Sequence, residues 1–307
     1  MKNSITITSI LQSMLTPEEV QRVVKLIGYE DKARKFTVYH LLQYWCMAAL
    51  EQWGSYRSSV DYAALCGLPV VHYSRFSTKA AEVPFSVFKE LFHILALRSE
   101  NGQPLQVVET LGSKHDGPMS EALAQPDYIL VMDCAYGKLE RLDHFKTHGQ
   151  SFVIRLRDNV HLEKPHALRR LTKSDSSVIR DITCQLGTPQ CRSRQCHRVV
   201  MFRDFEGREI RVVTDLMQVT AEQIAQIYKA RWQIEVFFRW IKQHLNIPTL
   251  FGTTENAVYG QLFCALIVYV LLNWLFIAAQ TSWPQHAVLS FARFSRLFLL
   301  QNYLLNG

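Results

Sequence analysis

The sequence has no internal repeat and no low-complexity tract, so neither a repeat architecture nor a largely disordered chain is expected. An apolar leader is also missing, because the opening stretch MKNSITITSILQSML is too polar for the core of a signal peptide. Cysteine is sparse, with 7 residues in 307, which fits a reducing compartment better than a disulfide-stabilised secreted protein. These features predict a cytoplasmic protein.

Acidic residues are too few to balance the basic ones. The 34 Lys and Arg residues exceed the 27 Asp and Glu residues, and the net charge of +7 indicates a polyanionic partner, although weakly by itself. Charged residues make up 20% of the chain and hydrophobic residues 48%, which is typical of a soluble globular protein with a large core. A length of 307 residues allows two or three domains.

Long apolar runs are scarce as well. Only residues 262–279, LFCALIVYVLLNWLFIAA, are long and apolar enough to cross a bilayer. Asn273 interrupts this run, no second run accompanies it, and no basic flank of the kind found beside membranes precedes it. Since a helix buried in a large core has the same composition, we predict a core helix and no membrane association.

The remaining patterns divide the chain into helical and strand-rich parts. Residues 1–97 have the spacing of helices, and from Thr220, which forms a capping-box pattern with Gln223, the chain is helical again. The expected strands lie between these parts, at 104–111, 128–133, 151–156, 176–183, 198–204 and 208–216. Strands flanked by helical ends predict an α/β core with helical additions.

A polar stripe runs along the apolar helix expected at 228–242, YKARWQIEVFFRWIK. At about 100° per residue, four polar side chains share an arc of about 60°, and these are Tyr228, Arg231, Glu235 and Lys242. Arg239 and Trp232 lie at the margin of the arc. The opposite side is expected to face the core and consists of Ala230, Ile234, Phe237 and Ile241.

Glu235 has two interpretations from the residues alone. Arg231 and Arg239, each four residues away, can form ordinary pairs with it along the helix, of small energetic value. The neighbouring apolar side chains, however, are expected to desolvate the carboxylate partly, and a desolvated carboxylate needs a paired charge or a metal.

Asp133 has two interpretations as well. It ends the apolar run YILVM, and a carboxylate at the carboxyl end of a buried strand is well placed to hold a metal at the edge of a sheet. The simpler interpretation is that Asp133 caps the helix expected in the residues that follow.

The spacing Tyr-x2-Arg-x3-Glu-x6-Lys resembles the YREK motif of bacterial insertion-sequence transposases, in the family numbered four. The segment MDCAYGKLERLDHF, with Asp133 and Tyr136, is similar to the second acidic motif of that family, and FVIRLRDN is similar to the strand that follows it. Further segments extend the resemblance over most of the chain: KFTVYHLLQYWCMAALEQWGSYRSS, HYSRFSTKAAEVPFSVFKELF and LNIPTLFGTTENAVYGQLFCALIVYVLL.

The resemblance implies a DNA transposase with a ribonuclease-H-like catalytic core. The core is expected in residues 98–160 and 219–307, with an N-terminal helical, DNA-binding region at 1–97 and a β-rich insertion at 161–218. Three acids, abbreviated DDE, hold two divalent metals, Mg2+ or Mn2+, that support in-line attack on a phosphodiester. The implied partners are double-stranded DNA, both element ends and target, and a second copy of the chain assembled on that DNA.

Carried over to this chain, Asp133 is the second acid and Glu235 the third, and both are metal ligands. The implied DNA-binding residues are Tyr228, Arg231, Trp232, Arg239 and Lys242. Among these, Trp232 is expected to stack on a flipped base. The terminal repeats, the target site and the route of cleavage are not implied by these residues.

The first acid of the family has no clear match. The family places it in a strand and follows it with Ser or Thr, but no Asp-Ser or Asp-Thr occurs between Phe92 and Gly102. Asp116 is the nearest carboxylate upstream of Asp133, although it matches another position of the family. Without a first acid, two-metal chemistry is expected to fail or to slow by orders of magnitude, which leaves a remnant that only binds DNA or interferes with an active transposase.

The section 161–218 gives weaker signals. Cys184, Cys191, Cys196 and His197 fit no familiar zinc spacing, so isolated thiols are expected. The section contains no Trp, so a base-stacking aromatic is not expected from it. Its basic residues either follow a DNA backbone or form a solvated face, and they are Arg169, Arg170, Lys173, Arg192, Arg194 and Arg198.

Overall fold

The computed structural model describes residues 7–98, 107, 118–168, 176–245, 249–280 and 289–306. The chain forms two compact units. The helical unit comprises residues 1–108 and 237–307, and the sheet unit comprises residues 109–236. The units divide the chain differently from the three regions expected from the sequence, because the last helices pack with the N-terminal ones and because the strands of 161–218 continue the sheet of 130–155.

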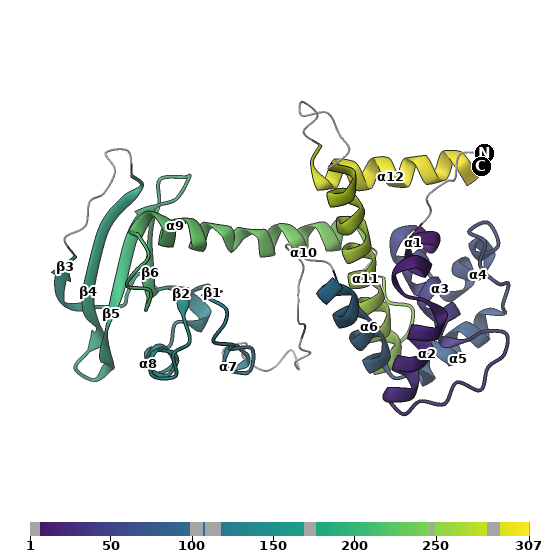
Figure 1. The fold of residues 1–307 in the computed structure, drawn as a ribbon, viewed down its shortest axis with the longest axis horizontal. Coiled ribbons are helices and arrows are strands. Elements are labelled where there is room, and N and C mark those ends of the chain that lie inside the picture. The colour runs from purple at the N-terminus through teal and green to yellow at the C-terminus, as the bar shows by residue number, and fades with distance from the viewer. Residues whose placement is uncertain are drawn as a thin grey trace. The chain divides into compact units, whose positions relative to one another are not determined.

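The helical unit is built around one long apolar helix, α11 (Glu255–Gln280), which packs against α3 (Val38–Leu50), α5 (Tyr73–Glu82) and α6 (Phe85–Arg98) (Figure 1). The other helices of this unit are α1 (Ile7–Met14), α2 (Pro17–Leu26), α4 (Tyr56–Ala63) and α12 (Phe291–Asn306). Capping boxes at Thr16, Thr37 and Ser55 fix the starts of α2, α3 and α4. Expected helices therefore appear where the sequence pattern placed them.

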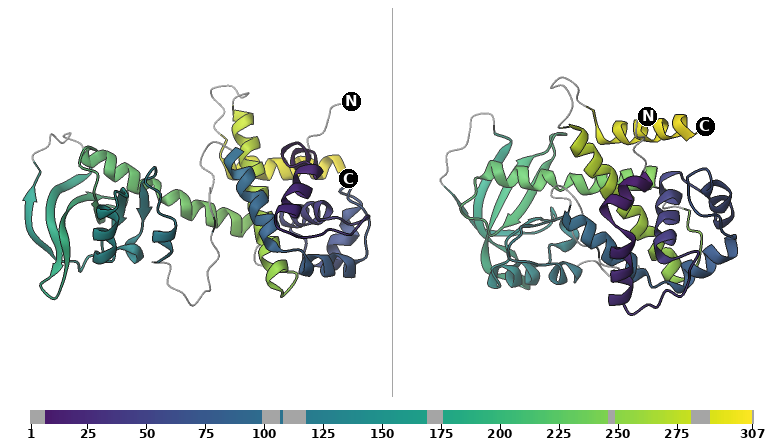
Figure 2. Two further views of the ribbon diagram at one scale, coloured as in Figure 1. Left: turned by 60° about the horizontal axis from the view of Figure 1, so that its bottom comes forward. Right: turned by 45° about the vertical axis from the view of Figure 1, so that its right-hand side comes forward.

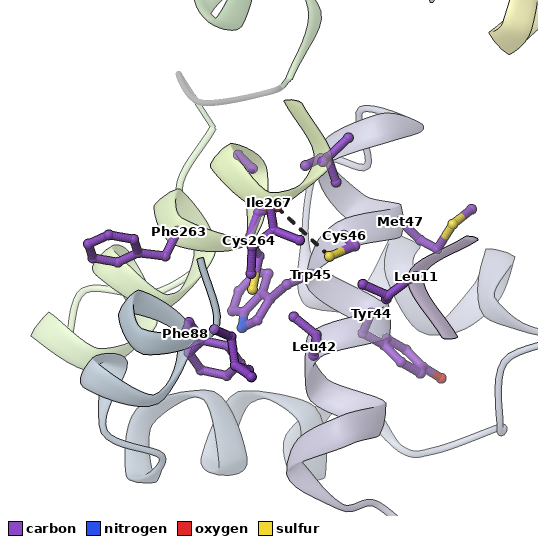
Figure 3. Close-up of a cluster of buried hydrophobic side chains, with 14 of the residues drawn as sticks. Leu11, Leu42, Tyr44, Trp45, Cys46, Met47, Phe88, Phe263, Cys264 and Ile267 are labelled. Carbon is purple, nitrogen blue, oxygen red and sulfur yellow. Dashed lines mark hydrogen bonds between the residues drawn. The ribbon is translucent and has the colours of Figure 1, made fainter. Parts of the chain in front are cut away.

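The apolar run at 262–279 lies in α11, and its first part fills the core of the helical unit (Figure 3). Phe263 and Cys264 are buried together with Trp45 of α3 and Phe88 of α6. A Cβ at Gly260 would lie 3.3 Å from the Phe88 ring, so the absence of a side chain there permits close helix packing. The burial ends at Leu272, and after Asn273 the helix is partly exposed. Among the described residues, α11 is the one helix whose length and composition would allow it to cross a membrane.

The sheet unit contains six strands in the order β1-β2-β6-β5-β4-β3. Figure 2 shows this sheet from two further directions. The strands are β1 (Leu130–Met132), β2 (Phe152–Arg155), β3 (Leu162–Ala167), β4 (Val178–Thr188), β5 (Cys191–Arg203) and β6 (Glu209–Thr214). The pair β1–β2 is parallel and the other pairs are antiparallel. Two of the first three expected strands thus share one sheet, whereas residues 104–106 and 108–111 lie outside the described residues. The α/β class is confirmed.

Two helices cover opposite faces of this sheet. The helix α8 (Leu139–Thr147) places Leu142 and Phe145 on the face formed by Phe152 and Ile154 of β2. The helix α9 (Ala221–Ala230) packs on the other face, where it meets Val153. The unit also has a short helix, α7 (Met119–Ala122).

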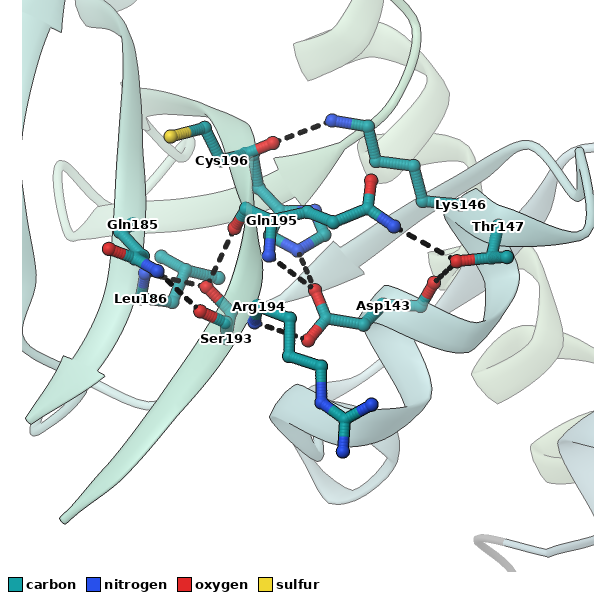
Figure 4. Close-up of polar contacts among 10 residues, drawn as sticks. Asp143, Lys146, Thr147, Gln185, Leu186, Ser193, Arg194, Gln195 and Cys196 are labelled. Carbon is teal, nitrogen blue, oxygen red and sulfur yellow. Dashed lines mark hydrogen bonds and ion pairs between the residues drawn. The ribbon is translucent and has the colours of Figure 1, made fainter. Parts of the chain in front are cut away.

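A buried carboxylate attaches α8 to β5 (Figure 4). Asp143 accepts hydrogen bonds from the backbone N–H groups of Arg194 and Gln195, at 2.6 and 3.2 Å. Its Oδ1 also lies 2.9 Å from Nε2 of His197. Burial lowers the pKa of His197, and the hydrogen bond with the accepting carboxylate of Asp143 acts in the opposite direction. His197 therefore serves the packing of this unit.

Candidate active site

Asp133 follows β1 directly and caps a short 3-10 helix, η1 (Cys134–Tyr136). Its Oδ1 accepts a 2.8 Å hydrogen bond from the N–H of Ala135, so Asp133 does cap the helical turn that follows it. This contact uses only one of the two carboxylate oxygens. The helix expected from residue 134 onward is interrupted, because Gly137 ends η1 and α8 starts only at Leu139. The second oxygen of Asp133, Oδ2, accepts no hydrogen bond from any residue that the structure describes.

The extended backbone of Asp133, with φ −80° and ψ −176°, continues the alternation of β1. Val131 packs on the α9 face of the sheet, whereas Leu130 and Met132 pack on the α8 face. Since side chains two residues apart in a strand share a face, Asp133 belongs to the α9 side. The carboxylate is thus presented at the carboxyl end of β1, on the face that α9 covers.

The parallel register brings Arg155 beside Asp133. Met132 pairs with Ile154, so the next position along each strand is Asp133 in one and Arg155 in the other. The turn after Asp133 lies against the end of β2, since a Cβ at Gly137 would be 3.2 Å from the carbonyl oxygen of Arg155. Arg155 was not predicted as a site residue. The alternation of FVIRLR, with Val153 and Arg155 on one face, was the available signal.

Tyr228 lies at the end of α9, with its ring against Phe202 of β5 at a centroid distance of 6.2 Å. Burial raises the pKa of Tyr228, while the guanidinium groups of Arg231 and Arg155 act in the opposite direction through charge and hydrogen bonding. The net shift is upward, so the phenol keeps its proton at neutral pH and can donate a hydrogen bond. Two cations therefore flank one phenolic hydroxyl.

Arg231 connects this group to Glu235. Its Nη1 lies 2.6 Å from Oε1 of Glu235, and the two side chains are 19% and 35% exposed. The pairing expected from the four-residue spacing is therefore present. It does not satisfy the carboxylate, because Oε2 of Glu235 and Nε of Arg231 are buried and have no hydrogen-bond partner among the described residues. Leaving such a group unsatisfied costs about 1–3 kcal/mol, which a ligand can recover.

These contacts gather five side chains at one edge of the sheet, and we call Asp133, Arg155, Tyr228, Arg231 and Glu235 the edge cluster. The strands β1 and β2 are parallel, and both β2 and β5 are antiparallel to β6. The strands β1, β2 and β5 therefore run in the same direction, and their carboxyl ends lie at this edge. The cluster combines two carboxylates, each with one oxygen free of partners among the described residues, with two guanidinium groups. Such a set can bind a hard divalent cation and a phosphate side by side.

The helix after Arg231 differs from the expectation. The helix expected at 221–245 is interrupted at Arg231, and α10 extends over Trp232–His244. The predicted core stripe is wrong in its first half, since Ala230 is exposed and Ile234 is 53% exposed. Only from Phe237 onward does α10 pack on the helical core, where Phe237 contacts Tyr269 at 4.7 Å. Oε2 of Glu235 is nevertheless buried, so the expected partial desolvation of this carboxylate is present.

The other predicted site residues have different surroundings. Trp232 is 48% exposed. Arg239 and Lys242 are exposed and belong to the helical unit, whereas the edge cluster belongs to the sheet unit. Asp116, the possible replacement for the first acid, lies outside the described residues, and so do residues 99–102. The assignment of Asp133 and Glu235 as metal ligands, with carboxylates about 4–7 Å apart as a shared metal requires, stays a prediction.

One residue considered for DNA binding is excluded by its burial. Arg198 has a fully buried side chain that donates two hydrogen bonds to the carboxylate of Asp181, each of 2.8 Å. Its Nη1 also donates to the carbonyl oxygens of Leu216 and Val219. Arg192 pairs with Glu163, while Arg194 remains exposed. The arginines of β5 therefore differ in burial and pairing, and their spacing in the sequence did not show which of them are available to bind DNA.

Comparison with known proteins shows the family to which this chain belongs. Residues 82–271 match the model of the transposase DDE domain. The chain is 43% identical to a probable transposase for insertion sequence element IS5377 of Geobacillus stearothermophilus, over 97% of this chain and 92% of the relative. It is 28% identical to a putative transposase for insertion sequence element IS4SA of Synechocystis, over 58% of this chain and 51% of the relative. The piggyBac transposase in a synaptic complex with hairpin DNA is similar at a TM-score of 0.44 and 10% identity, covering 96% of this chain and 79% of that one.

The alignment with the Geobacillus relative bears on the missing acid. It spans 347 positions, more than the 307 residues of this chain, so the relative has internal residues without a counterpart here. DDE transposases act on DNA and generally use divalent metal ions. The chain belongs to the DDE transposases of insertion sequences, as the sequence resemblance predicted.

Proposed function

We propose that this transposase binds the ends of its own insertion sequence at the edge cluster and that it cuts them poorly. The observation that most supports this binding site is that Arg155 and Arg231 flank the Tyr228 hydroxyl. At the same edge, Asp133 and Glu235 each have one carboxylate oxygen without a partner among the described residues. Guanidinium groups bind phosphate oxygens in a planar, two-point manner, and a phenol adds a donor. Tyr136 and Lys242 of the motif match are further candidates.

The carboxylates fit a divalent cation in their chemistry. Oxygen ligands are those that Mg2+ and Mn2+ prefer, and the unpartnered Oε2 of Glu235 is an acceptor that a cation would satisfy. We propose Asp133 and Glu235 as ligands of Mg2+ or Mn2+, which when bound supplies Lewis acidity and an activated water. Until then, Arg231 holds Glu235 in place, and Tyr228 keeps Arg231 oriented through its ring and hydroxyl.

Poor cutting follows from the missing first acid. Two acids support two-metal chemistry less well than three, because the ligand that bridges the metals is lost. Exposed apolar residues at the start of α10 support the loss of a strand: Ile234 and Phe238, one turn apart on the same side of the helix, are each about half exposed. In a complete core such residues are expected to lie beneath a neighbouring element. We further propose assembly as a homodimer on DNA, in the cytoplasm and near the nucleoid.

Binding through the edge cluster predicts an effect that is independent of DNA sequence. Arg155→Ala and Arg231→Ala should each weaken binding to any duplex by roughly fivefold to tenfold and lower the salt dependence, because each removes a phosphate contact. Glu235→Gln should bind as well as the unchanged chain or better, since a negative charge near phosphate is removed. Fluorescence anisotropy at several salt concentrations measures both effects.

The matched control is Arg192→Ala, which removes a cation at the opposite end of β5, where Arg192 pairs with Glu163. This variant should change affinity less than twofold, by roughly the value of one remote charge. Equal affinities for Arg155→Ala, Arg231→Ala and Arg192→Ala would show that DNA does not bind at the edge cluster.

The hairpin between β5 and β6 adds an aromatic side chain at the same edge of the sheet. Phe205 is 80% exposed at its tip. Asp204 shapes the turn by accepting 2.9 Å hydrogen bonds from the N–H groups of Glu206 and Arg208, and Gly207 takes the left-handed conformation with φ +80°. Sequence reasoning looked for Trp and missed this residue. We propose that Phe205 stacks on an unpaired base at the element end.

Phe205→Ala should therefore weaken binding to a duplex with an unpaired terminal base by about tenfold, the value of one base–aromatic stack, and should leave a fully paired duplex less affected. Phe205→Trp should retain the binding. Quenching of a 2-aminopurine placed at the unpaired position reports the stack directly. If Phe205→Ala quenches the probe as well as the unchanged chain does, the hairpin tip does not contact that base.

A further inference from the structure

Two histidines lie next to each other at the end of α8. His144 and His148 are four residues apart, so their side chains share one side of the helix. Both are exposed, and their ring centroids are 4.0 Å apart, with 36° between the ring planes. The helical turn between them is complete, because the N–H of His148 donates a 3.0 Å hydrogen bond to the carbonyl oxygen of His144. The backbone therefore holds two imidazoles together at the surface of the sheet unit.

One hydrogen bond determines which nitrogen of His148 can bind a ligand. Its Nδ1 lies 2.8 Å from the carbonyl oxygen of His144. Because a carbonyl oxygen can only accept, Nδ1 carries the proton, and Nε2 of the neutral ring keeps its lone pair. Histidines that bind metal ions are oriented in the same way, with the second ring nitrogen donating to a carbonyl or carboxylate oxygen. His148 therefore has the tautomer and the anchored ring of a metal ligand.

The charges around the two histidines favour a cation. Glu140 is exposed one turn earlier on the same side of α8. Lys146 is two residues from each histidine, about 200° around the helix, and its Nζ donates a 2.6 Å hydrogen bond to the carbonyl oxygen of Cys196 (Figure 4). Its charge is thus directed toward β5. The carboxyl end of a helix, where the last carbonyl groups gather, also attracts positive charge.

Two other interpretations of these histidines explain less. A cap at the end of the helix is the simpler role of His148, since its Nδ1 satisfies a carbonyl group of the last turn. That role does not account for the ring of His144 beside it. A phosphate is disfavoured as a ligand, because it would meet the carboxylate of Glu140 on the same side of the helix. A metal ion uses both rings and is attracted by the same carboxylate.

We propose that His144 and His148 bind one divalent transition-metal ion, Zn2+, Ni2+ or Cu2+, with water at its other positions. Imidazole nitrogens suit these ions, whereas Mg2+ prefers oxygen ligands. Two nitrogens that share a metal at about 2.1 Å lie about 3 Å apart, so rings centred 4.0 Å apart need to move little. In the part of the chain that the structure describes, no three His, Cys, Asp or Glu side chains gather closely enough to hold one metal together, so the two histidines supply the protein ligands.

This metal site is distinct from the edge cluster. The helix α8 begins after β1 ends and finishes before β2 begins, and β1 and β2 are parallel. The two histidines therefore lie toward the amino ends of these strands, whereas the edge cluster lies at their carboxyl ends. The last turn of α8 also follows Asp143, which accepts hydrogen bonds from the backbone of β5. A metal bound to this turn stabilises α8 in its folded form, and with it the attachment of α8 to the sheet.

The test measures Ni2+ binding to the full chain by equilibrium dialysis, after alkylation of the exposed thiols of Cys191 and Cys196. Excess Mg2+ is present throughout, so that oxygen-rich sites are occupied. The unchanged chain should bind one Ni2+ near neutral pH. His144→Gln and His148→Gln should each weaken binding by about tenfold or more, because one imidazole alone remains. Lowering the pH to about 5.5 should release the ion, because an imidazole binds metal only without its second proton.

The matched control removes two exposed histidines elsewhere in the same unit. His161→Gln combined with His166→Gln changes residues in and beside β3 and should retain Ni2+ affinity within about twofold. Stability gives a second measurement, because an ion that binds the folded form shifts the folding equilibrium. Ni2+ at about 100 times its dissociation constant should raise the folding equilibrium constant of the unchanged chain by up to about 100-fold in urea unfolding, and should leave both single variants nearly unchanged.

Three results would contradict the proposal. If the unchanged chain binds no Ni2+, or if the control double variant loses as much affinity as His144→Gln, the proposed site is overturned. If binding survives both single variants, the ion is held by other residues. If Ni2+ binds at the two histidines without moving the urea transition, the proposed stabilisation of α8 is wrong.

Discussion

Restoring the missing segment should raise DNA nicking by about a thousandfold or more, because catalytic groups that act as a unit lose nearly all activity when one is absent. The unchanged chain should nick its element ends at a rate close to background with Mg2+ or Mn2+. A chimera that receives the corresponding segment of the Geobacillus relative between Arg98 and Gly102 should nick readily. Single-turnover cleavage of a labelled end duplex measures both rates.

The chimera also tests the two assigned acids. Asp133→Asn or Glu235→Gln in the chimera should return the rate to that of the unchanged chain while DNA binding survives. A different result would refute the proposed impairment: if the unchanged chain nicks and Asp116→Ala alone abolishes the activity, Asp116 has replaced the first acid.

The buried pair of Arg198 and Asp181 should dominate the stability of the sheet unit. Asp181→Ala is expected to lower the free energy of unfolding by about 3–5 kcal/mol, because it leaves a fully buried guanidinium without its carboxylate. Urea unfolding followed by circular dichroism measures the change. The remaining bonds from Arg198 to Leu216 and Val219 hold the connection before α9, so the loss should also loosen the helix that carries Tyr228.

Two variants make this test specific. Arg211→Ala removes a partly exposed pair with Glu209 and should cost less than about 1 kcal/mol. Replacing both buried partners, Asp181→Leu with Arg198→Met, should recover much of the loss, because apolar groups of similar volume tolerate the interior. If Asp181→Ala costs no more than Arg211→Ala, the buried pair contributes little.

Local spacing predicted the elements that carry the site. The apolar run before Asp133 indicated β1, the alternation at 151–156 indicated β2, and the capping box at Thr220 marked the start of α9. Helical spacing also predicted the pairing of Arg231 with Glu235. These features depend on neighbours within about one turn or one strand, which is what a sequence pattern encodes.

The features that were missed depend on contacts between distant segments. Arg155 became a site residue only through the register of β1 with β2, and Arg198 was excluded from DNA binding only by its pairing with Asp181. The core stripe through Ile234 was wrong because a helical period shows which residues share a side but not what covers that side. The helix α5 was not singled out within the helical spacing of residues 1–97.

The exposed apolar residues at the start of α10 also have a consequence for the cell that carries this gene. Neighbouring exposed apolar residues such as Ile234 and Phe238 promote self-association, and chaperones and proteases remove such proteins preferentially. We therefore expect a short lifetime and a low steady-state abundance. A protein that occupies element ends but is quickly cleared competes only briefly with intact transposases. The loss that we propose as the cause of poor cutting would therefore also limit the interference of this chain with mobile copies of its element.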